Sequence, residues 1–554
     1  MKEEHDKSMT ISSVDLIIIV IYMAGILFVG LWSVREIKHQ TSESYFLANR
    51  SLRWPVVGAA LFASNISTIH LVGLAESGFG IGMVVGNFEW MATFTLMLLT
   101  LIFVPIYFRT RITTLPEFME NRYSPTARTV LAVMFIMSAM LIHIGISLYA
   151  GAAVFEQFFG IPPWASIAAI SSITAIYTVV GGLRAVVVTE TIQTAILLTG
   201  AVIITVIAFT KLPDAGIHSY SDLVDATMPN QLSMIHTPGE EGYDRESVWY
   251  GFLLGFPILG LWYWCTDQTI VQRVLGAKTL RDAQHGALFA GLLKVLPPFF
   301  MVLPGVLAYV LFKDIIAEPK DALPTLITEL LPVGLVGIMA AALLAALMST
   351  IAAALNSTGT LVAVDIAKHV RPDMSEDMQV RIGRISSVIV MILAIAWSTQ
   401  GDKFGSIFQA INKMPAQFIA PPIATVLVWG VFWRRGTSQA GTFTLLFGFL
   451  AGLVIFMFDM GFEFLGGVQY VSDPENGLGI PFMMQAFYYF CILSVVYVGI
   501  SLATPPPSNE QVEGVTWESP LAFLKHAEVT GIFDPRLLAA LLLSFLGLMY
   551  FLIR

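Results

Sequence analysis

The chain is a succession of long apolar runs, and most of them reach the length needed to cross a lipid bilayer. About 20 apolar residues in a helix span the roughly 30 Å of hydrocarbon. Only 12% of the residues are charged and 56% are hydrophobic, which excludes an ordinary soluble domain. Candidate runs lie near 11–34, 53–76, 81–107, 126–156, 160–180, 186–210, 247–272, 279–312, 333–366, 382–400, 404–433, 439–460, 480–503 and 536–553. The sequence predicts an all-α polytopic membrane protein with about 14 transmembrane helices.

Lys and Arg are distributed unevenly between alternate loops. With the N-terminus outside, the loops on the other side carry 20 of the 30 basic residues and the loops on the N-terminal side carry 8. Cytoplasmic loops hold the excess of basic residues, so both termini are predicted outside. The run at 11–34 follows an acidic head without a small-residue cleavage site, which indicates a retained helix. The lack of a large eukaryotic-type extension favours a multi-pass protein of the bacterial inner membrane.

Two of the runs are interrupted in the middle. A polar cluster from Ala63 to His70 divides one run, and Phe256-Pro257 followed by Gly260 divides another. Pro removes a backbone donor and Gly weakens a helix, so backbone groups are freed inside the membrane. Broken helices at corresponding places of two halves predict inverted repeats with substrate and ion sites at the breaks. Ordinary kinks, as in receptors and channels, are the alternative.

The predicted organisation follows from these two breaks, because five runs start at each. An odd number of spans per half inserts the second half upside down. The predicted parts are an extra N-terminal helix and cytoplasmic loop (1–52), a first five-helix repeat (53–210), an extracellular loop (211–246), a second five-helix repeat (247–434) and three C-terminal helices (435–554).

An aromatic and polar segment follows the second interruption. It runs Leu-Trp-Tyr-Trp-Cys-Thr-Asp-Gln from Leu261 to Gln268. Polar groups at membrane depth must be satisfied internally, so such a segment is functional by default. An aromatic belt at the membrane surface is the alternative.

Two neighbouring hydroxyls, Ser349 and Thr350, lie in a run rich in small residues. Small residues let helices approach closely, so these hydroxyls can face the first break. Unwound carbonyls together with hydroxyls supply the oxygen ligands of a sodium ion. Helix packing, or a bond back to the i−4 carbonyl, is an equally good interpretation of the two residues alone.

Two charged residues, Glu89 and Lys294, lie inside apolar runs, where each would cost a few kcal/mol if unpartnered. The apolar runs also contain side chains that can hydrogen-bond or stack. Such side chains would bind the edge hydroxyls and the flatter face of a neutral polyol such as a sugar. A structural Glu89–Lys294 ion pair is the alternative. For one of the others, His70, a satisfied interior histidine is the default. The accompanying residues are His70, Trp90, Tyr263, Trp264, Gln409 and Asn412.

Glu190 begins a run from the cytoplasmic side, so it is interpreted as a cation ligand or, preferably, as an acid at a helix N-terminus.

No Gly-x-x-x-x-Gly-Lys-Ser/Thr loop, zinc-type His/Cys spacing or Gly-x-Ser-x-Gly elbow occurs. The chain is therefore predicted not to be an enzyme, and an ion gradient is its expected energy source. Neither a nucleic acid nor an obligate protein partner is predicted, and the bilayer is the expected surrounding.

From about Ser42 to Arg435 the chain resembles the sodium/solute symporters, and within them the sodium/glucose cotransporters. The Trp-Tyr-Trp-Cys-Thr-Asp-Gln run favours the sugar branch over the proline and pantothenate branches. The matching segments are Ser44–Ala48, Ser64–Ser67, Phe88–Trp90, Gly181–Val186, Trp262–Gln268, Val271–Arg273, Gly276–Lys278, Leu293-Lys294 and Leu355–Thr358.

The resemblance implies a site for Na+ and a site for sugar, residue by residue. The implied sodium ligands are the carbonyls of Ala63, Ile66 and Ala346 and the hydroxyls of Ser349 and Thr350. The implied sugar contacts are His70, Glu89, Lys294 and Trp264, with Tyr263 as the inner gate.

Three positions depart from the family pattern. Gly260 stands where the family usually has a polar side chain on the sugar, and Asn412 replaces the usual Gln at a substrate position. Glu190 stands where an Asp marks a second sodium site in some members, which leaves a second sodium open. These departures leave the sugar open, including a myo-inositol-like one.

The function implied is a secondary active symporter that couples inward sodium flow to uptake of a sugar or related polyol by alternating access. Two rivals are kept. A symporter for another solute such as a monocarboxylate would keep the sodium site but favour a more cationic pocket, and a sensor would bind sugar without transport.

Overall fold

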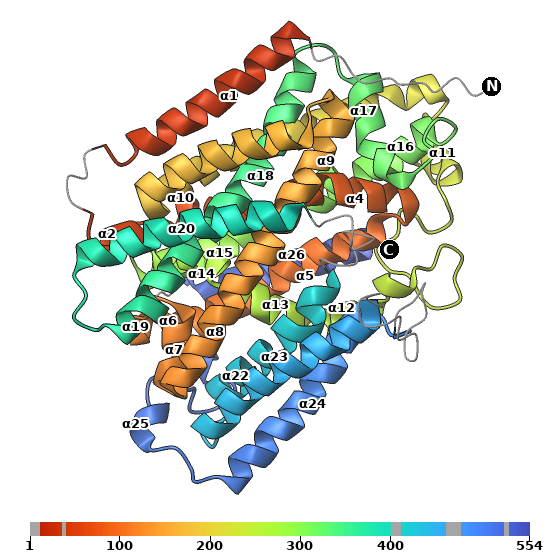
Figure 1. Ribbon diagram of the computed structural model, residues 1–554. Coiled ribbons are helices and arrows are strands. Elements are labelled where there is room, and N and C mark those ends of the chain that lie inside the picture. The colour runs from red at the N-terminus through yellow and green to blue at the C-terminus, as the bar shows by residue number, and fades with distance from the viewer. Residues whose placement is uncertain (1–11, 36–39, 400–411, 461–477, 526–530, 554) are drawn as a thin grey trace.

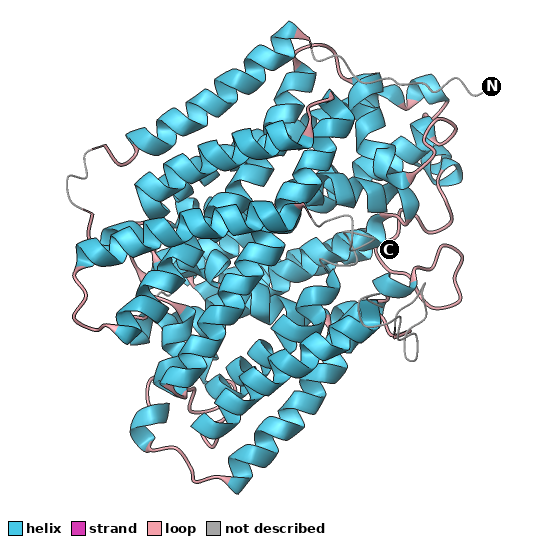
Figure 2. Ribbon diagram, viewed as in Figure 1, coloured by secondary structure: helices cyan, strands magenta, loops and turns pink. Residues whose placement is uncertain are grey.

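The computed structural model describes residues 12–35, 40–399, 412–460, 478–525 and 531–553 as a bundle of helices joined by loops (Figure 1). Within these ranges no strand occurs (Figure 2), and one isolated bridge joins Leu52 to Ala277. Eleven of the described helices are long and apolar enough to cross a membrane, and one bent pair raises the number to twelve. The predicted all-α polytopic fold is confirmed at this level.

The helices have the following bounds, with π-helical turns joining several of them. The N-terminal half contains α1 (Ser13–Trp32), α2 (Ser42–Leu47), α3 (Trp54–Asn65), α4 (Thr68–Gly80), α5 (Asn87–Leu98), α6 (Val104–Thr110), α7 (Leu115–Arg122), α8 (Pro125–Ser138), α9 (Ser147–Phe159), α10 (Pro163–Lys211) and α11 (Tyr220–Ala226). The middle contains α12 (Trp249–Leu254), α13 (Phe256–Cys265), α14 (Gln268–Leu275), α15 (Leu280–Leu293), α16 (Leu303–Phe312), α17 (Ala322–Leu330), α18 (Leu335–Thr360), α19 (Lys368–Val370) and α20 (Glu376–Ser398). The C-terminal part contains α22 (Ala420–Phe432), α23 (Ser438–Met460), α24 (Phe482–Ala503), α25 (Asn509–Val512) and α26 (Pro535–Leu552).

Helix α10 covers two of the predicted runs and folds back on itself at Gly182, where φ is 59° and ψ is −154°. Such a backbone conformation is essentially restricted to glycine. A Cβ placed on Gly30 would lie 2.7 Å from Tyr177 Cβ and 3.4 Å from Thr189 Cγ2. A straight helix would hold these two residues about 18 Å apart. The chain therefore reverses between them, as predicted runs at 160–180 and 186–210 require.

The predicted break in the first half is confirmed. Helix α3 ends at Asn65, the backbone of Ile66 and Ser67 is extended, and α4 starts at Thr68. The segments Trp54–Asn65 and His70–Gly80 are bent by 61° relative to one another. Ser67 donates its backbone N–H to His70 Nδ1 at 3.2 Å, so a side chain replaces one of the missing helical bonds.

The second half is interrupted twice: at Gly255, beside the predicted Phe256-Pro257, where α12 ends and α13 begins, and again after Cys265, where α13 ends. Gly260 is inside α13, and Gly255 before Pro257 keeps helical dihedral angles. Helix α13 ends at Cys265, and Asp267, which precedes α14, has an extended ψ of 122°. Asp267 is the physical reason for this later interruption, because its carboxylate accepts the N–H of Thr269 at 2.8 Å and caps the new helix α14.

Among the long described helices α18 is the most enclosed, and nearly every residue in it is buried. It packs against α10, α20, α1 and α3, so the hydroxyls on it face other helices instead of lipid. At one end of the bundle Asp15 Oδ1 in α1 accepts the N–H groups of Gly334 and Gly337, at 2.8 and 2.7 Å. Helix α26 finishes at that same end, on the right in Figure 1, while α2, α6 and α19 lie at the opposite end.

Candidate functional site

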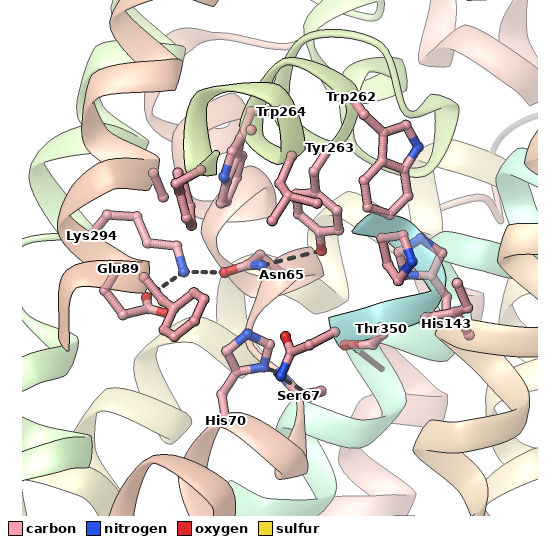
Figure 3. A pocket seen from close by; sticks show the side chains of 18 of the residues that line it. Asn65, Ser67, His70, Glu89, His143, Trp262, Tyr263, Trp264, Lys294 and Thr350 are labelled. Atoms are coloured by element: carbon pink, nitrogen blue, oxygen red, sulfur yellow. Dashed lines mark hydrogen bonds and ion pairs between the residues drawn. The ribbon is translucent and has the colours of Figure 1, made fainter. Parts of the chain in front are cut away.

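A cavity of about 210 Å³ lies beside the two breaks. Its wall combines polar side chains of α3, α4 and α5 and of Lys294, which follows α15, with the aromatic side chains of α13 (Figure 3). The six residues that the family resemblance places at the substrate all line it. These residues are His70, Glu89, Tyr263, Trp264, Lys294 and Asn412.

A chain of hydrogen bonds crosses the cavity wall from Glu89 to Tyr263. Lys294 Nζ lies 2.5 Å from Glu89 Oε2 and also donates to Asn65 Oδ1. Asn65 Nδ2 in turn donates to the Tyr263 hydroxyl oxygen at 3.2 Å. The Glu89–Lys294 ion pair, which was the alternative interpretation of these two charges, is therefore present and satisfies both of them. One of the three Lys294 donors and Glu89 Oε1 have no protein partner in the described part of the chain.

The aromatic wall has rings in contact with each other and with the lysine. Tyr263 packs edge-on against both Trp262 and Trp264, with ring centroids 5.5 and 5.2 Å apart. Lys294 Nζ lies 5.3 Å from the centroid of the Trp264 ring. The rings offer apolar faces for stacking, and the cation fixes the position of one of them.

His70 combines a structural role with a place in the cavity wall. Its Nδ1 lies 3.0 Å from Ser67 Oγ and accepts the Ser67 backbone N–H, so the ring stabilises the start of α4. Its other ring nitrogen is left for the cavity toward which the ring points in Figure 3. The default interpretation as an interior histidine and the substrate-contact interpretation are thus compatible.

The predicted sodium ligands meet at the first break. Ser349 Oγ lies 2.9 Å from the carbonyl oxygens of both Ala63 and Ala346. Thr350 Oγ1 lies 3.2 Å from the Ala346 carbonyl and 3.5 Å from that of Ser64. Ile66 contributes an extended residue at the break itself, where its carbonyl is outside helix α3. Neutral oxygen atoms from two helices converge here, which is the donor set a sodium ion takes at a helix break.

Glu190 is fully buried and paired, and it lies in the interior of α10. Arg273 Nη2 donates to Glu190 Oε1 at 2.6 Å and Arg273 Nε to Oε2 at 3.3 Å. Ser64 Oγ donates to Oε1 at 2.8 Å. The interpretation as a helix N-terminal acid was wrong, because the partners are side chains of α3 and α14. The carboxylate links the first break to the helix that follows the second.

Several residues of the cavity wall were not predicted from the sequence. His143 lines the cavity, and its Nε2 lies 3.4 Å from Asp267 Oδ2. Trp262 Nε1 is a buried donor without an acceptor in the described ranges. The only sequence signal for His143 was a single polar residue inside an apolar run. Trp90, by contrast, is buried outside the wall and donates to the Val295 carbonyl at 3.2 Å. Gln409 lies outside the described residues.

A helical membrane bundle with a polar cavity at broken helices and neutral oxygen ligands beside it defines an ion-coupled secondary transporter. The model of the sodium:solute symporter family matches residues 45–452 of this chain. The chain belongs to the sodium:solute symporter family.

Known relatives and structures agree with this assignment. The chain is 34% identical over 536 residues to sodium/myo-inositol cotransporter 2 of Oryctolagus cuniculus, covering 91% of this chain and 78% of that protein. It is 33% identical over 544 residues to sodium/glucose cotransporter 1 of the same organism, covering 91% and 81%. A Na+-coupled sialic acid symporter, solved in a substrate-bound outward-open state, shares the fold with a TM-score of 0.75 at 19% identity, over 90% of this chain and 99% of that chain.

Proposed function

We propose that this protein is a sodium-coupled secondary active symporter that imports a neutral sugar or related polyol by alternating access. The observation that carries the proposal is the placement of the Glu89–Lys294–Asn65–Tyr263 chain and the Trp264 ring in one cavity beside the Ser349–Ala63 contact. Family membership and sodium-dependent relatives support the same function.

The substrate side of the proposal rests on the donors and acceptors of the wall. Hydroxyls donate to carboxylate oxygens and accept from ammonium, amide and imidazole groups, all of which the cavity offers. The wall also has an aromatic side, which suits the flatter face of a sugar or cyclitol ring. The names of the relatives, myo-inositol and glucose cotransporters, support a polyhydroxylated ring. Under this proposal His70, Glu89, Trp264, Lys294 and Asn412 bind the substrate and Tyr263 is the inner gate.

The coupling side rests on the first break. A sodium ion held by Ala63, Ile66, Ala346, Ser349 and Thr350 joins the α3–α4 break to α18. Sodium shifts the conformational equilibrium only by the difference between its affinities for the two states. It must therefore bind one state more strongly than the other in order to favour that state. Each sodium that enters through 100 mV contributes about 2.3 kcal/mol, which is enough for roughly fifty-fold accumulation.

The topology proposed is fourteen membrane helices with two inverted five-helix repeats and both termini outside. The fold-back of α10 at Gly182 and the divided segment from Trp249 to Leu275 support separating these regions into further spans. Asp15 bonds to the loop before α18, and the Ile553 carbonyl accepts the N–H of Met234 in the predicted extracellular segment. Both ends of the chain thus contact loops predicted to be outside, which supports an even number of spans. The proposed location remains the bacterial inner membrane.

Two rival functions differ in what they predict for the cavity. A symporter of a monocarboxylate would need a free cation, whereas Lys294 is paired with Glu89 at 2.5 Å. This pairing favours a neutral substrate. A sensor would bind sugar with the same wall residues but without net flux.

Uptake into proteoliposomes tests the proposal. Labelled glucose, galactose and myo-inositol are supplied with and without an inward sodium gradient at clamped voltage. We expect accumulation of at least one of them that requires the sodium gradient. Binding without accumulation would favour the sensor, and uptake of a labelled monocarboxylate in place of all three polyols would replace the substrate class.

A further inference from the structure

A second pocket, which we call the basic pocket, lies at the end of the bundle opposite to the start of α1. It has a volume of about 940 Å³ and is bounded by the ends of α2 and α6, the loop between α14 and α15, and Lys525. Helices α2, α6 and α14 lie on the left in Figure 1. The residues of this pocket belong to neither the proposed sodium site nor the proposed sugar site.

Arg50 builds the floor of the basic pocket. It donates to the carbonyls of Leu275, Arg111 and Ile112 at 3.3, 3.2 and 3.0 Å, and so ties three separate segments together. Both Arg50 and Arg111 have positive φ values, 46° and 49°. Non-glycine residues are held in this conformation only when their surroundings impose it, and such residues gather at binding sites. The pocket is therefore a built feature of the fold.

The charge facing the basic pocket is strongly positive. Arg50, Arg109, Arg111, Lys278 and Lys525 line it against a single acid, Glu43, which pairs with Arg50 at 3.4 Å. The other four cations have no carboxylate partner within the described ranges, and all four are exposed. Arg109 also lies over the Trp517 ring at 5.4 Å from its centroid. Four exposed cations around one hollow produce a positive potential that attracts an anion.

The remaining wall of the basic pocket is membrane helix. Pro105 and Phe108 belong to a candidate membrane span, and Leu280 begins another. The same first turn of α15 that carries Leu280 also carries Arg281 at the end of an apolar groove of about 590 Å³ between α15 and α26. The groove is lined mainly by leucine and phenylalanine side chains of two candidate membrane helices, so it offers an apolar place for an acyl chain.

We propose that the basic pocket binds the headgroup of an anionic glycerophospholipid from the leaflet at this end of the bundle. Basic pockets between membrane helices on the cytoplasmic side bind such headgroups. The excess of basic residues at this end assigns it to the cytoplasmic leaflet. A soluble phosphate would satisfy the charges but would not use the apolar groove. This inference is independent of the transported substrate.

Lipid binding to the detergent-solubilised full-length protein tests the proposal, with thermal unfolding as the readout and no sugar or sodium gradient present. Phosphatidylglycerol is titrated against phosphatidylcholine with the same acyl chains. The test variant carries Arg111→Gln, Lys278→Gln and Lys525→Gln, whose side chains are exposed. The matched control carries Lys211→Gln, Lys313→Gln and Lys320→Gln, which remove the same charge at the other end.

We expect phosphatidylglycerol to stabilise the natural sequence and the control variant, and phosphatidylcholine to do so far less. The test variant should bind phosphatidylglycerol about a hundredfold more weakly, from about 1 kcal/mol for each of three charges. Equal affinity in the test and control variants would overturn the proposal. If inorganic phosphate stabilises the protein as much as phosphatidylglycerol does, the pocket binds soluble anions and the lipid proposal is overturned. Because no transport is measured, failure here is separate from failure of the symporter proposal.

Discussion

Lys294 Nζ lies 2.5 Å from Glu89 Oε2, and neither side chain is more than 4% exposed. The pair belongs to the protein's architecture and to the cavity at once, because Lys294 also orients Asn65. A substrate hydroxyl at this wall would bind groups that are already fixed by each other. Little reorganisation is then needed on binding, which favours affinity.

The first prediction concerns the removal of one charge of this pair. Glu89→Ala should abolish sugar uptake and also destabilise the protein by about 3–5 kcal/mol, because Lys294 is left as an unpaired buried cation. Unfolding in denaturant together with uptake into proteoliposomes measures both effects. A variant that unfolds like the natural protein would show that Lys294 finds another partner or loses its proton.

A paired replacement separates the two effects. Glu89→Leu with Lys294→Met removes both charges, and such replacements of buried pairs are often neutral for stability. We expect near-normal unfolding but loss of sugar binding, because both the acceptor and the donor are gone. Normal uptake by this double variant would remove the pair from the proposed substrate site.

The second prediction concerns sodium. Ser349→Ala with Thr350→Ala should raise the sodium concentration for half-maximal uptake about tenfold or more, because a hydrogen bond or contact to a charged group is worth about 1.5–3 kcal/mol. Thr358→Ala is the matched control, since Thr358 is a buried hydroxyl of the same helix that bonds to the Ala354 carbonyl. Sodium dependence is measured as uptake at fixed sugar. Equal shifts in both variants would move the ion away from the first break.

The bundle and its first break follow from the sequence because the signals are local. Long apolar runs predict helices in a membrane, and the cluster from Ala63 to His70 is too polar for an unbroken one. Pro257 and Gly260 marked the interruption between α12 and α13, whereas the further break at Asp267 was not predicted. The Thr269 N–H donates to the Asp267 carboxylate, which caps the start of α14; this Asp-x-Thr signal is local but was not used in the prediction.

The charged and aromatic residues of the substrate cavity were predicted from the sequence, but most of the contacts that join the site residues to one another were not. Glu89 and Lys294 stand out because charges in apolar runs need partners. The pairing of Glu190 with Arg273 was not seen, since the two residues are separated by 83 positions and lie on different helices. His143 was missed because its neighbours in sequence are apolar, and only the fold brings it to Asp267.

The third prediction concerns the number of sodium ions. Glu190 accepts from Arg273 and Ser64, so a guanidinium already neutralises this carboxylate. The double variant Glu190→Gln with Arg273→Gln should therefore keep the sodium-to-sugar ratio of the natural protein, even if uptake slows. Dual-label flux at clamped voltage measures the ratio. A lower ratio would restore Glu190 as a ligand of a second sodium ion.

The fourth prediction concerns Gly260, which lies in α13 and lines the substrate cavity. A Cβ at this position would lie 2.3 Å from Thr95 Cγ2 and 3.0 Å from Thr95 Cβ. Helices α13 and α5 are thus packed so closely that a side chain at residue 260 would clash with Thr95 unless Thr95 moved or became smaller. Gly260→Ala alone should destabilise the protein by about 1–3 kcal/mol and reduce uptake, as overpacking does.

Adding Thr95→Ala to Gly260→Ala tests this explanation directly. It removes the atom at 2.3 Å and leaves a neighbour at 3.0 Å, so stability and uptake should recover in large part. Thr95→Ala alone is the control for loss of the hydroxyl, which bonds to the Ala92 carbonyl at 3.0 Å. The double-mutant cycle should give a coupling free energy of about 0.5–3 kcal/mol in the rescuing direction. Additive losses would mean that Gly260 is required for another reason, such as backbone access to the substrate.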